Sequence, residues 1–283
     1  MKLAIAGLGL IGASIGLRGR RFGWNVTGYD PSVAALDEAM ARGALDARAA
    51  SFDELLRGRD LAVLAAPVDK LPAILAQMGA WNAAGGTLPR LIIDVGSVKA
   101  PVVRAAAGIP GFIGTHPLAG STRSGPAGAL GSLFHGRPWA YVPTEDALAC
   151  ERLLEFIKAM GARPVPIGAE EHDRIVALTS HLPQTLSIVL ATFLGESAAA
   201  TQVRALAGPG LESMTRLAQS PFPMWRGIYA ENGHNLVAAL KAVASLIESL
   251  VESGDGVDAT ILEQYFTQAN AFAETVFEGS VSE

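Results

Sequence analysis

The residues best suited to acid–base chemistry lie in one stretch from Ile93 to Gly125, which reads IDVGSVKAPVVRAAAGIPGFIGTHPLAGSTRSG. Its pattern predicts the end of a buried strand, a polar turn with Ser97 and Lys99, and a second short strand that ends at His116. A neutral imidazole at the carboxyl edge of a sheet can accept a proton near pH 7 if a partner orients it. We therefore expect His116 to be catalytic, with Ser97 as its partner, although Ser97 and Lys99 could also be helix-capping residues.

A glycine-rich turn opens the chain. The sequence GLGLIG, residues 7–12, follows an apolar strand at 2–6 and opens a helix at 11–22, and a second strand at 25–29 ends at Asp30. Glycines let the backbone approach a pyrophosphate at a helix amino terminus, and a carboxylate at this position binds ribose hydroxyls and repels a 2′-phosphate. We expect NAD to be preferred over NADP. The residues expected to contact it are Gly7, Gly9, Leu10, Ile11, Gly12 and Asp30, with Ala66 and Pro67 as a wall of the site.

Strands and helices alternate through the first part of the chain. Further strands are expected at 61–66, 91–95 and 112–115, and helices at 31–42, 52–56 and from about residue 70. Two more strands, 137–143 and 163–167, flank a helix with Thr144 as N-cap and Gly161 at its end, and we expect them to extend the sheet at one edge. The pattern predicts an α/β fold with a Rossmann-type, doubly wound, mostly parallel sheet.

After Gly168 the pattern is helical throughout. We expect helices at about 171–197, 201–206, 211–218, 224–253 and 257–278. The first of these is apolar nearly all round, which predicts burial between domains or between subunits. We therefore divide the chain into an NAD-binding Rossmann domain, residues 1–168, and an all-α substrate and dimerisation domain, residues 169–283, and expect a homodimer formed through the helical domain.

Composition narrows the class of partner. The net charge is −5, charged residues make up 17% of the chain, and no basic run exceeds Arg20–Arg21, so we expect a small-molecule substrate and no nucleic acid. The single Cys150 and the absence of Cys/His clusters predict no metal site and fit a reducing cytoplasm. Glycines interrupt the apolar amino terminus, and no run of 18 apolar residues follows. We therefore expect neither a signal peptide nor a membrane span.

The helical half carries several polar candidates. We interpret His172–Asp173, at the start of a helix, as a capping and packing pair. Ser180, His181 and Gln184 share the same helix, and residues 180 and 184 lie one turn apart on one face. Arg216 stands in a helix with little other charge, where a guanidinium is well suited to bind a carboxylate through two hydrogen bonds.

Five motifs together resemble those of one family. They are GLGLIGAS at the amino terminus, DVGSVK at 94–99, GTHPLAGS at 114–121, SHLPQ at 180–184 and TRLAQSPFPMW at 215–225. In these residues the chain resembles the prephenate and arogenate dehydrogenases of tyrosine biosynthesis. The resemblance implies a Rossmann domain, a helical dimer-forming domain and an active site between them. It also implies an NAD(P)-dependent oxidative decarboxylation of a cyclohexadiene to a phenol.

The resemblance also implies roles for single residues. His116 takes or shares the substrate hydroxyl proton, Ser97 orients that contact, and Arg216 binds a carboxylate. Prephenate-preferring members often have a histidine in place of Gln184 and an acid in place of Thr122, so this sequence favours arogenate or dual specificity. Because the chain ends soon after Phe277, we expect no appended mutase or regulatory domain. The substrate pocket is expected to include Gln184, Ser121, Thr122 and Trp225.

Two alternatives stay open at this point. A β-hydroxyacid-type dehydrogenase or an imine reductase would share the two-domain plan, but such enzymes typically use a lysine on the long interdomain helix, and residues 171–197 contain none. A non-catalytic NAD-binding protein would need the glycine turn and Asp30 but neither His116 nor Arg216.

Overall fold

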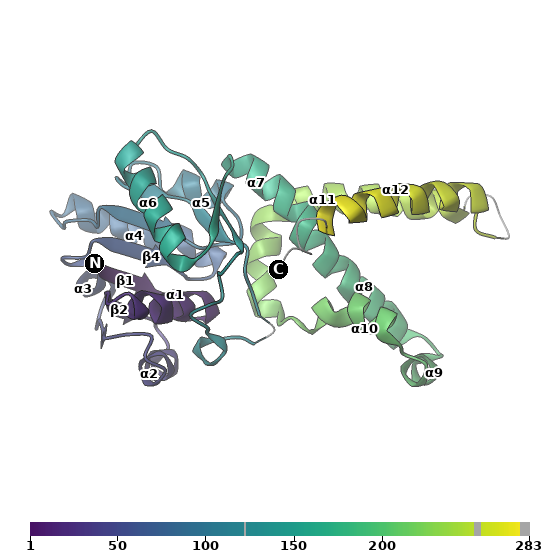
Figure 1. The fold of residues 1–283 in the computed structure, drawn as a ribbon, viewed down its shortest axis with the longest axis horizontal. Helices are drawn as coiled ribbons and strands as arrows, with labels where there is room; N and C mark the ends of the chain where they lie inside the picture. Colours follow the sequence, from purple (N-terminus) through teal and green to yellow (C-terminus); the bar gives the residue numbers. More distant parts are fainter. Residues whose placement is uncertain (122, 252–255, 278–283) are drawn as a thin grey trace. The chain divides into compact units, whose positions relative to one another are not determined.

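The computed structural model describes residues 1–121, 123–251 and 256–277, and the chain forms two compact units, residues 1–233 and 234–283. The first unit contains a six-stranded parallel sheet with helices on both faces, a small second sheet, and the helices of residues 169–233 (Figure 1). The expected α/β class, a Rossmann-type sheet followed by helices, is confirmed.

The large sheet has the strand order β3-β2-β1-β4-β5-β6, with every pair parallel. The strand order reverses between β1 and β4, and ligands of such sheets bind beyond the carboxyl ends of the strands at this reversal. The glycine turn follows β1 and Ala66 follows β4, so both lie at this point. The strands are β1 (Lys2–Ala6), β2 (Asn25–Tyr29), β3 (Ala47–Arg48), β4 (Leu61–Leu64), β5 (Leu91–Asp94) and β6 (Phe112–Ile113).

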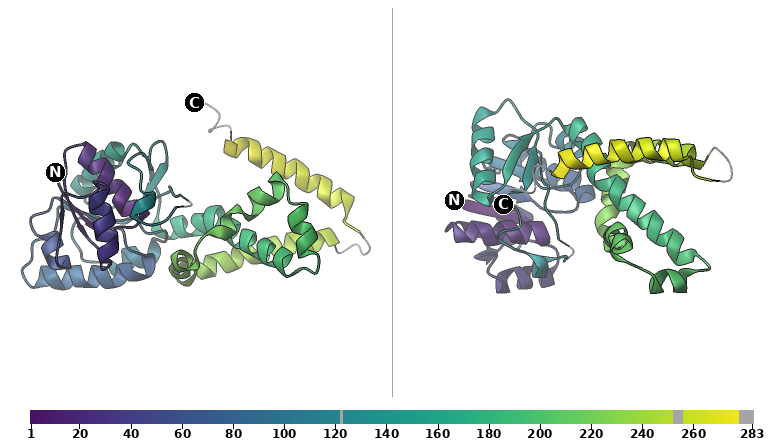
Figure 2. Two further views of the ribbon diagram at one scale, coloured as in Figure 1. Left: turned by 90° about the horizontal axis from the view of Figure 1, so that it is seen from below. Right: turned by 45° about the vertical axis from the view of Figure 1, so that its right-hand side comes forward.

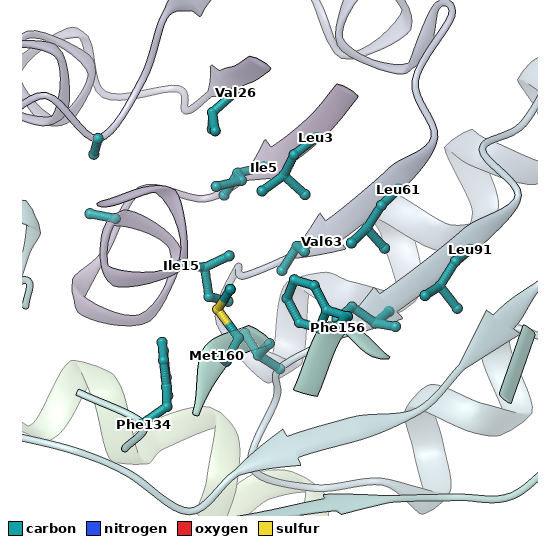
Figure 3. Packing of buried hydrophobic residues seen from close by; sticks show 14 of the residues in the cluster. Leu3, Ile5, Ile15, Val26, Leu61, Val63, Leu91, Phe134, Phe156 and Met160 are labelled. Atoms are coloured by element: carbon teal, nitrogen blue, oxygen red, sulfur yellow. The ribbon is translucent and has the colours of Figure 1, made fainter. Parts of the chain in front are cut away.

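Two apolar clusters cover the two faces of this sheet. Alternate residues of a strand point to opposite faces, so Leu3 and Ile5 belong to one cluster whereas Ala4 and Ala6 belong to the other. Figure 3 shows the first cluster, in which sheet residues pack against Ile15 of α1 and against α6. Helices α1 (Leu10–Arg21), α2 (Val33–Ala41) and α6 (Ala147–Met160) cover this face, and α3 (Phe52–Leu56), α4 (Leu71–Ala83) and α5 (Ala100–Ala105) cover the other.

The three glycines of the first turn have different physical roles. Gly7 has a φ of +96°, and a Cβ there would lie 2.5 Å from the carbonyl oxygen of Ala65. A Cβ on Gly12 would lie 2.0 Å from the carbonyl oxygen of Gly7, whereas one on Gly9 would meet nothing within 4 Å. The fold therefore requires glycine at positions 7 and 12, and Gly9 leaves open space beside the helix end.

The strand expected at 112–115 is divided at Gly114. β6 ends at Ile113, and β7 (Thr115–Pro117) pairs instead with β8 (Pro138–Tyr141) and, through it, with β9 (Arg163–Pro166). The chain leaves the large sheet because the Asp94 carboxylate accepts the N–H of Thr115 at 3.0 Å. Two expectations were thus wrong: His116 lies inside a strand rather than at its end, and β8 and β9 do not extend the large sheet.

Helix α6 also begins differently from the expectation. Its N-cap is Asp146, whose carboxylate accepts the N–H of Ala149 at 3.0 Å, and not Thr144. The predicted end is correct, because Gly161 caps the helix with a left-handed φ of +79°.

The helices after Gly168 follow the predicted order with one interruption. The first predicted helix consists of α7 (Ala169–Val176), a π-helical turn η3 (Ala177–His181) and α8 (Leu182–Glu196). Figure 2 shows that this segment, coloured teal to green, begins beside the sheet and extends away from it. The remaining elements are α9 (Ala200–Ala205), α10 (Pro209–Thr215), the 3₁₀ turn η4 (Arg216–Gln219), α11 (Phe222–Val251), which has a non-helical residue at Asn232, and α12 (Ala259–Phe277).

We predict that Gly12→Ala lowers the free energy of unfolding by roughly 1–3 kcal/mol, because its methyl group would overlap the backbone at Gly7. Gly9→Ala is the matched control and should leave stability unchanged, since its methyl group enters open space. Urea unfolding of both variants measures the difference. Equal stability of Gly12→Ala and the wild type would contradict this account of the turn.

Candidate active site

The glycine turn and Asp30 form a site whose chemistry fits a dinucleotide. Gly9 is the N-cap of α1, so no side chain satisfies the free N–H groups of the first helical turn, which are then available to an anion. The Asp30 carboxylate accepts the N–H groups of Leu8 and Ser32, each at 2.8 Å. A carboxylate offers about four lone-pair sites, so Asp30 keeps capacity for two ribose hydroxyls.

The loop after β4 lies against the glycine turn, because a Cβ on Gly7 would lie 2.5 Å from the carbonyl oxygen of Ala65. The start of α11 packs closely against it, because a Cβ on Gly227 would lie 3.0 Å from a carboxylate oxygen of Asp69. Trp225 packs against the apolar cluster that contains Val68. Ala66, Pro67 and Trp225 are therefore brought to one part of the first unit.

A buried ion pair joins the end of β5 to the start of β7. The Lys99 ammonium donates to the Asp94 carboxylate and, at 2.7 Å, to the carbonyl oxygen of Thr115. Asp94 also accepts the N–H groups of Gly96 and Thr115. Burial lowers the pKa of Lys99, while Asp94 and Asp173 oppose that change. The pair holds the residue next to His116, so the Lys99 side chain is neither a helix cap nor a group open to the cleft.

His116 contacts a histidine from the helical half of the chain. Its Nδ1 lies 3.0 Å from Nε2 of His172, and Nδ1 of His172 lies 2.8 Å from an Asp173 carboxylate oxygen. His172 and Asp173 are both buried. Among the described residues no hydrogen bond joins Ser97 to His116, so the partner that the structure gives to His116 is His172.

Asp173 is a helix cap, as interpreted, but it caps a helix of the other half of the chain. Its carboxylate accepts the N–H groups of Lys99 at 2.6 Å and Ala100 at 2.8 Å, at the amino end of α5. The contact between His172 and His116 was missed. Its only signal in the sequence is a His–Asp dipeptide after the last strand, and that dipeptide does not indicate which group it meets.

The surroundings of His116 disfavour its charged form. Burial is the main cause that lowers the pKa of His116 well below its usual range, and His172, Lys99 and His181 act in the same direction. His116 is therefore neutral at pH 7, which is the form that can accept a proton.

His181 lies at the end of the π-helical turn, in contact with α11. Its Nδ1 lies 3.2 Å from Nδ2 of Asn232, which also donates to the carbonyl oxygen of Asp173 at 2.7 Å. Its ring meets Trp225 edge-on, with 6.0 Å between ring centroids. Burial lowers the pKa of His181 to about 4. The turn thus ties α11 to the segment that carries Asp173.

Gln184 holds the turn that carries Arg216. Its amide donates to the carbonyl oxygen of Leu217 at 2.8 Å and accepts from the Ser220 hydroxyl at 3.4 Å. The side chain is buried, and both amide atoms are engaged within the chain. Arg216 itself is exposed. The Arg216 guanidinium is therefore accessible to a ligand carboxylate. Gln184 acts on Arg216 indirectly, because it binds the backbone of the turn that carries Arg216.

Other predicted site residues make no hydrogen bond or ion pair with His116 among the described residues, or lie outside those residues. Ser121 is exposed, and its hydroxyl accepts the N–H of Arg123 at 3.1 Å. Thr122 lies outside the described residues. Within the part of the chain that the structure describes, no hydrogen bond or ion pair joins Ser121 or Arg216 to His116. In that same part, no group of three His, Cys, Asp or Glu side chains could hold a metal ion.

Two family models match most of the chain. Residues 14–165 match the nucleotide-binding domain of prephenate dehydrogenase, and residues 168–268 match the dimerization domain of the same family. The first match alone spans more than half of the 283 residues.

Individual relatives agree with the family models. A protein named probable prephenate dehydrogenase NovF, from Streptomyces niveus, is 37% identical over 264 residues, which cover 89% of this chain and 70% of the relative. The prephenate dehydrogenase of Bacillus subtilis strain 168 is 32% identical over 282 residues, with coverages of 96% and 75%. A crystal structure of A. aeolicus prephenate dehydrogenase with hydroxyphenyl propionate and NAD⁺ matches with a TM-score of 0.84 at 25% identity, covering 98% of each chain. The chain therefore belongs to the prephenate dehydrogenase family, as the motifs in its sequence indicate.

Proposed function

We propose that this chain catalyses the NAD-dependent oxidative decarboxylation of a cyclohexadienyl substrate, arogenate, prephenate or both. The observation that carries the proposal is a neutral, half-buried His116, held at Nδ1 by His172 and placed in its strand by the Asp94–Lys99 pair. Family membership supports the same reaction and disfavours a β-hydroxyacid-type dehydrogenase or an imine reductase.

In this reaction the chain handles a proton and two carboxylates. His116 takes the proton of the substrate hydroxyl at Nε2, and Ser97 orients that contact. NAD, when bound, supplies the hydride acceptor, and Gly7, Gly9 and Asp30 are among the residues that would hold it. Loss of CO₂ makes the ring aromatic, so the chain need only hold the carboxylates in place.

The substrate side of the site lies on the helical half of the chain. Arg216 binds a carboxylate through its exposed guanidinium, and Gln184 fixes the turn from which it extends. Ser121 and Trp225 line the pocket. Glutamine in place of the histidine of many prephenate-preferring members favours arogenate or dual specificity, and it acts through the Arg216 turn because both of its amide atoms are engaged within the chain. A difference of less than ~3 kcal/mol would decide this preference.

NAD is the preferred cofactor. An Asp30 carboxylate at the ribose position accepts hydrogen bonds from two hydroxyls and repels a 2′-phosphate. The next residues, Pro31 and Ser32, offer no cation that would bind a phosphate. These features support NAD over NADP.

We place the domain boundary at residue 168 and propose a cytoplasmic homodimer formed through the helical domain, with no membrane or nucleic-acid partner. Two helical stretches, Ala169–Glu196 and Phe222–Val251, are apolar and long enough to cross a membrane by length and composition. The exposed apolar faces of these helices could be covered by a second subunit as well as by a membrane. Match to a dimerization domain supports this assignment. The exposed apolar side chains include Leu178, Val189, Phe193, Met214, Leu246 and Phe272.

Steady-state assays with prephenate and with L-arogenate test the proposal, each at saturating NAD and then with NADP. Turnover of arogenate, alone or with prephenate, supports both the reaction and the inference from Gln184. Turnover of prephenate alone keeps the reaction and discards that inference. If neither substrate reacts, the proposed function is wrong, and a non-catalytic NAD-binding protein or another dehydrogenase becomes the better interpretation.

We predict that His116→Asn lowers kcat by about 10²–10⁴-fold, because asparagine cannot accept the hydroxyl proton. NAD affinity should stay within about twofold of the wild type, since the glycine turn is untouched. Steady-state kinetics and NAD titration measure the two effects. His135→Asn, at an exposed histidine, is the control. Equal loss of activity and NAD affinity would contradict the catalytic role.

We predict that Arg216→Ala raises KM about 10–100-fold with a smaller change in kcat, because a carboxylate contact contributes to binding before the chemical step. Arg216→Lys should recover only part of the loss, since an ammonium cannot make the paired contact. A fall in kcat at unchanged KM in both variants would argue against substrate binding by Arg216.

We predict that kcat/KM is constant from pH 8 down to about 6.5 and falls only at lower pH. The reason is that burial and the neighbouring cation lower the pKa of His116 below its ordinary 6.5, so protonation, which blocks the acceptor, begins only on further acidification. A pH profile of kcat/KM measures this limb. An acid limb centred above pH 7 would be incompatible with a His116 that is neutral at pH 7.

A further inference from the structure

His172 contacts the proposed proton acceptor and Asp173 contacts His172, but neither has a part in the reaction described so far. Both side chains are buried, and they come from α7, while His116 comes from β7. The His172 and His116 rings meet edge-on, with 5.2 Å between their centroids. A buried histidine with a carboxylate on one nitrogen and a second imidazole on the other is an arrangement that can pass a proton.

The contacts of Asp173 determine which nitrogen of His172 carries a hydrogen. Its carboxylate oxygens accept the N–H groups of Lys99 and Ala100, and the same oxygen that accepts from Lys99 lies 2.8 Å from Nδ1 of His172. An ionised carboxylate is acceptor-only, so a ring nitrogen in contact with it must be the donor. Nδ1 of His172 must then carry a hydrogen.

The hydrogen on Nδ1 of His172 determines which nitrogen of His116 carries a hydrogen and which carries a lone pair. A neutral His172 with hydrogen on Nδ1 has a lone pair on Nε2, so its contact with His116 at 3.0 Å requires His116 to donate from Nδ1. Neutral His116 then has its lone pair on Nε2. The chain Asp173–His172–His116 thus selects the one tautomer of His116 that can accept a proton at Nε2.

The same surroundings decide where a positive charge is most stable. The charged and titratable groups around His116 are Lys99 with its partner Asp94, His181, and the pair His172 and Asp173. The Lys99 ammonium and burial oppose a charge on His116 itself. The Asp173 carboxylate contacts His172, so a charge there gains a direct ion pair.

We propose that His172 is a proton-relay and positioning residue for His116. When Nε2 of His116 takes the substrate hydroxyl proton, Nδ1 of His116 passes its own proton to Nε2 of His172. One proton enters His116 and one leaves it, and the resulting His172 imidazolium pairs with the Asp173 carboxylate. The hydride lost by the ring goes to NAD⁺. This inference rests on the proposed function and adds a second histidine to it.

The variant that tests the relay is His172→Gln, because a glutamine carbonyl still accepts from Nδ1 of His116 but cannot take up a proton. We expect kcat to fall about 10²-fold, with KM and NAD affinity within threefold of the wild type. We also expect the acid limb of kcat/KM to move to higher pH, because the variant removes one of the groups that lower the pKa of His116. His135→Gln, at an exposed histidine, should match the wild type.

Two results would overturn the relay. One is a His172→Gln enzyme with kcat within twofold of the wild type. The other is a variant in which kcat falls, KM rises and NAD binds more weakly to similar degrees, while the acid limb of kcat/KM stays at its wild-type pH. A purely structural role predicts that result. If the wild type turns over neither prephenate nor arogenate, the proposed function fails instead, so the two failures are distinguishable.

A measurement on the wild-type enzyme keeps the test independent of how the variant folds. We expect kcat in mixtures of H₂O and D₂O to follow a bowed curve against deuterium fraction, because two protons move in one step. A straight line, or no isotope effect, would overturn the relay.

Discussion

One ionised carboxylate, that of Asp173, holds the candidate site together. It accepts two backbone N–H groups at the amino end of α5 and contacts the ring of His172, so it joins the sheet half of the chain to the long helical segment. Hydrogen bonds to a charged group contribute about 1.5–3 kcal/mol each. The same contacts that attach α7 to α5 also orient the imidazole beside His116. The Asp173 carboxylate therefore both attaches the two halves of the chain and orients the site.

The buried Asp94–Lys99 pair has a different kind of role. Removing two charges from water costs free energy that their attraction only partly offsets, so such a pair is a weak source of stability. Its geometric effect is strong, because Asp94 turns the chain out of the large sheet at Thr115 and Lys99 holds that carbonyl. His116 follows directly. The pair therefore contributes little to stability, but it fixes the position of His116.

Local patterns in the sequence were sufficient for most of the first half of the chain. The glycine turn, Asp30 and the parallel strands follow from apolar runs and glycine spacing, which act over a few residues. Contacts across the chain could not be predicted in this way. His116 and His172 are 56 positions apart, and Ser97, much nearer in sequence, is not the partner. The break at Gly114 depends on a carboxylate 21 positions before Thr115, and the engagement of Gln184 with the Arg216 turn likewise needs the tertiary fold.

Asp173 fixes the tautomers of His172 and His116 if the proton relay is correct. ¹⁵N NMR of histidine-labelled protein above pH 7 tests it most directly, because ring nitrogens with and without hydrogen have well separated shifts. Signals are assigned with His116→Asn and His172→Gln. We predict that both rings are neutral, with hydrogen on Nδ1 and a lone pair on Nε2. Hydrogen on Nε2 of either ring would contradict it.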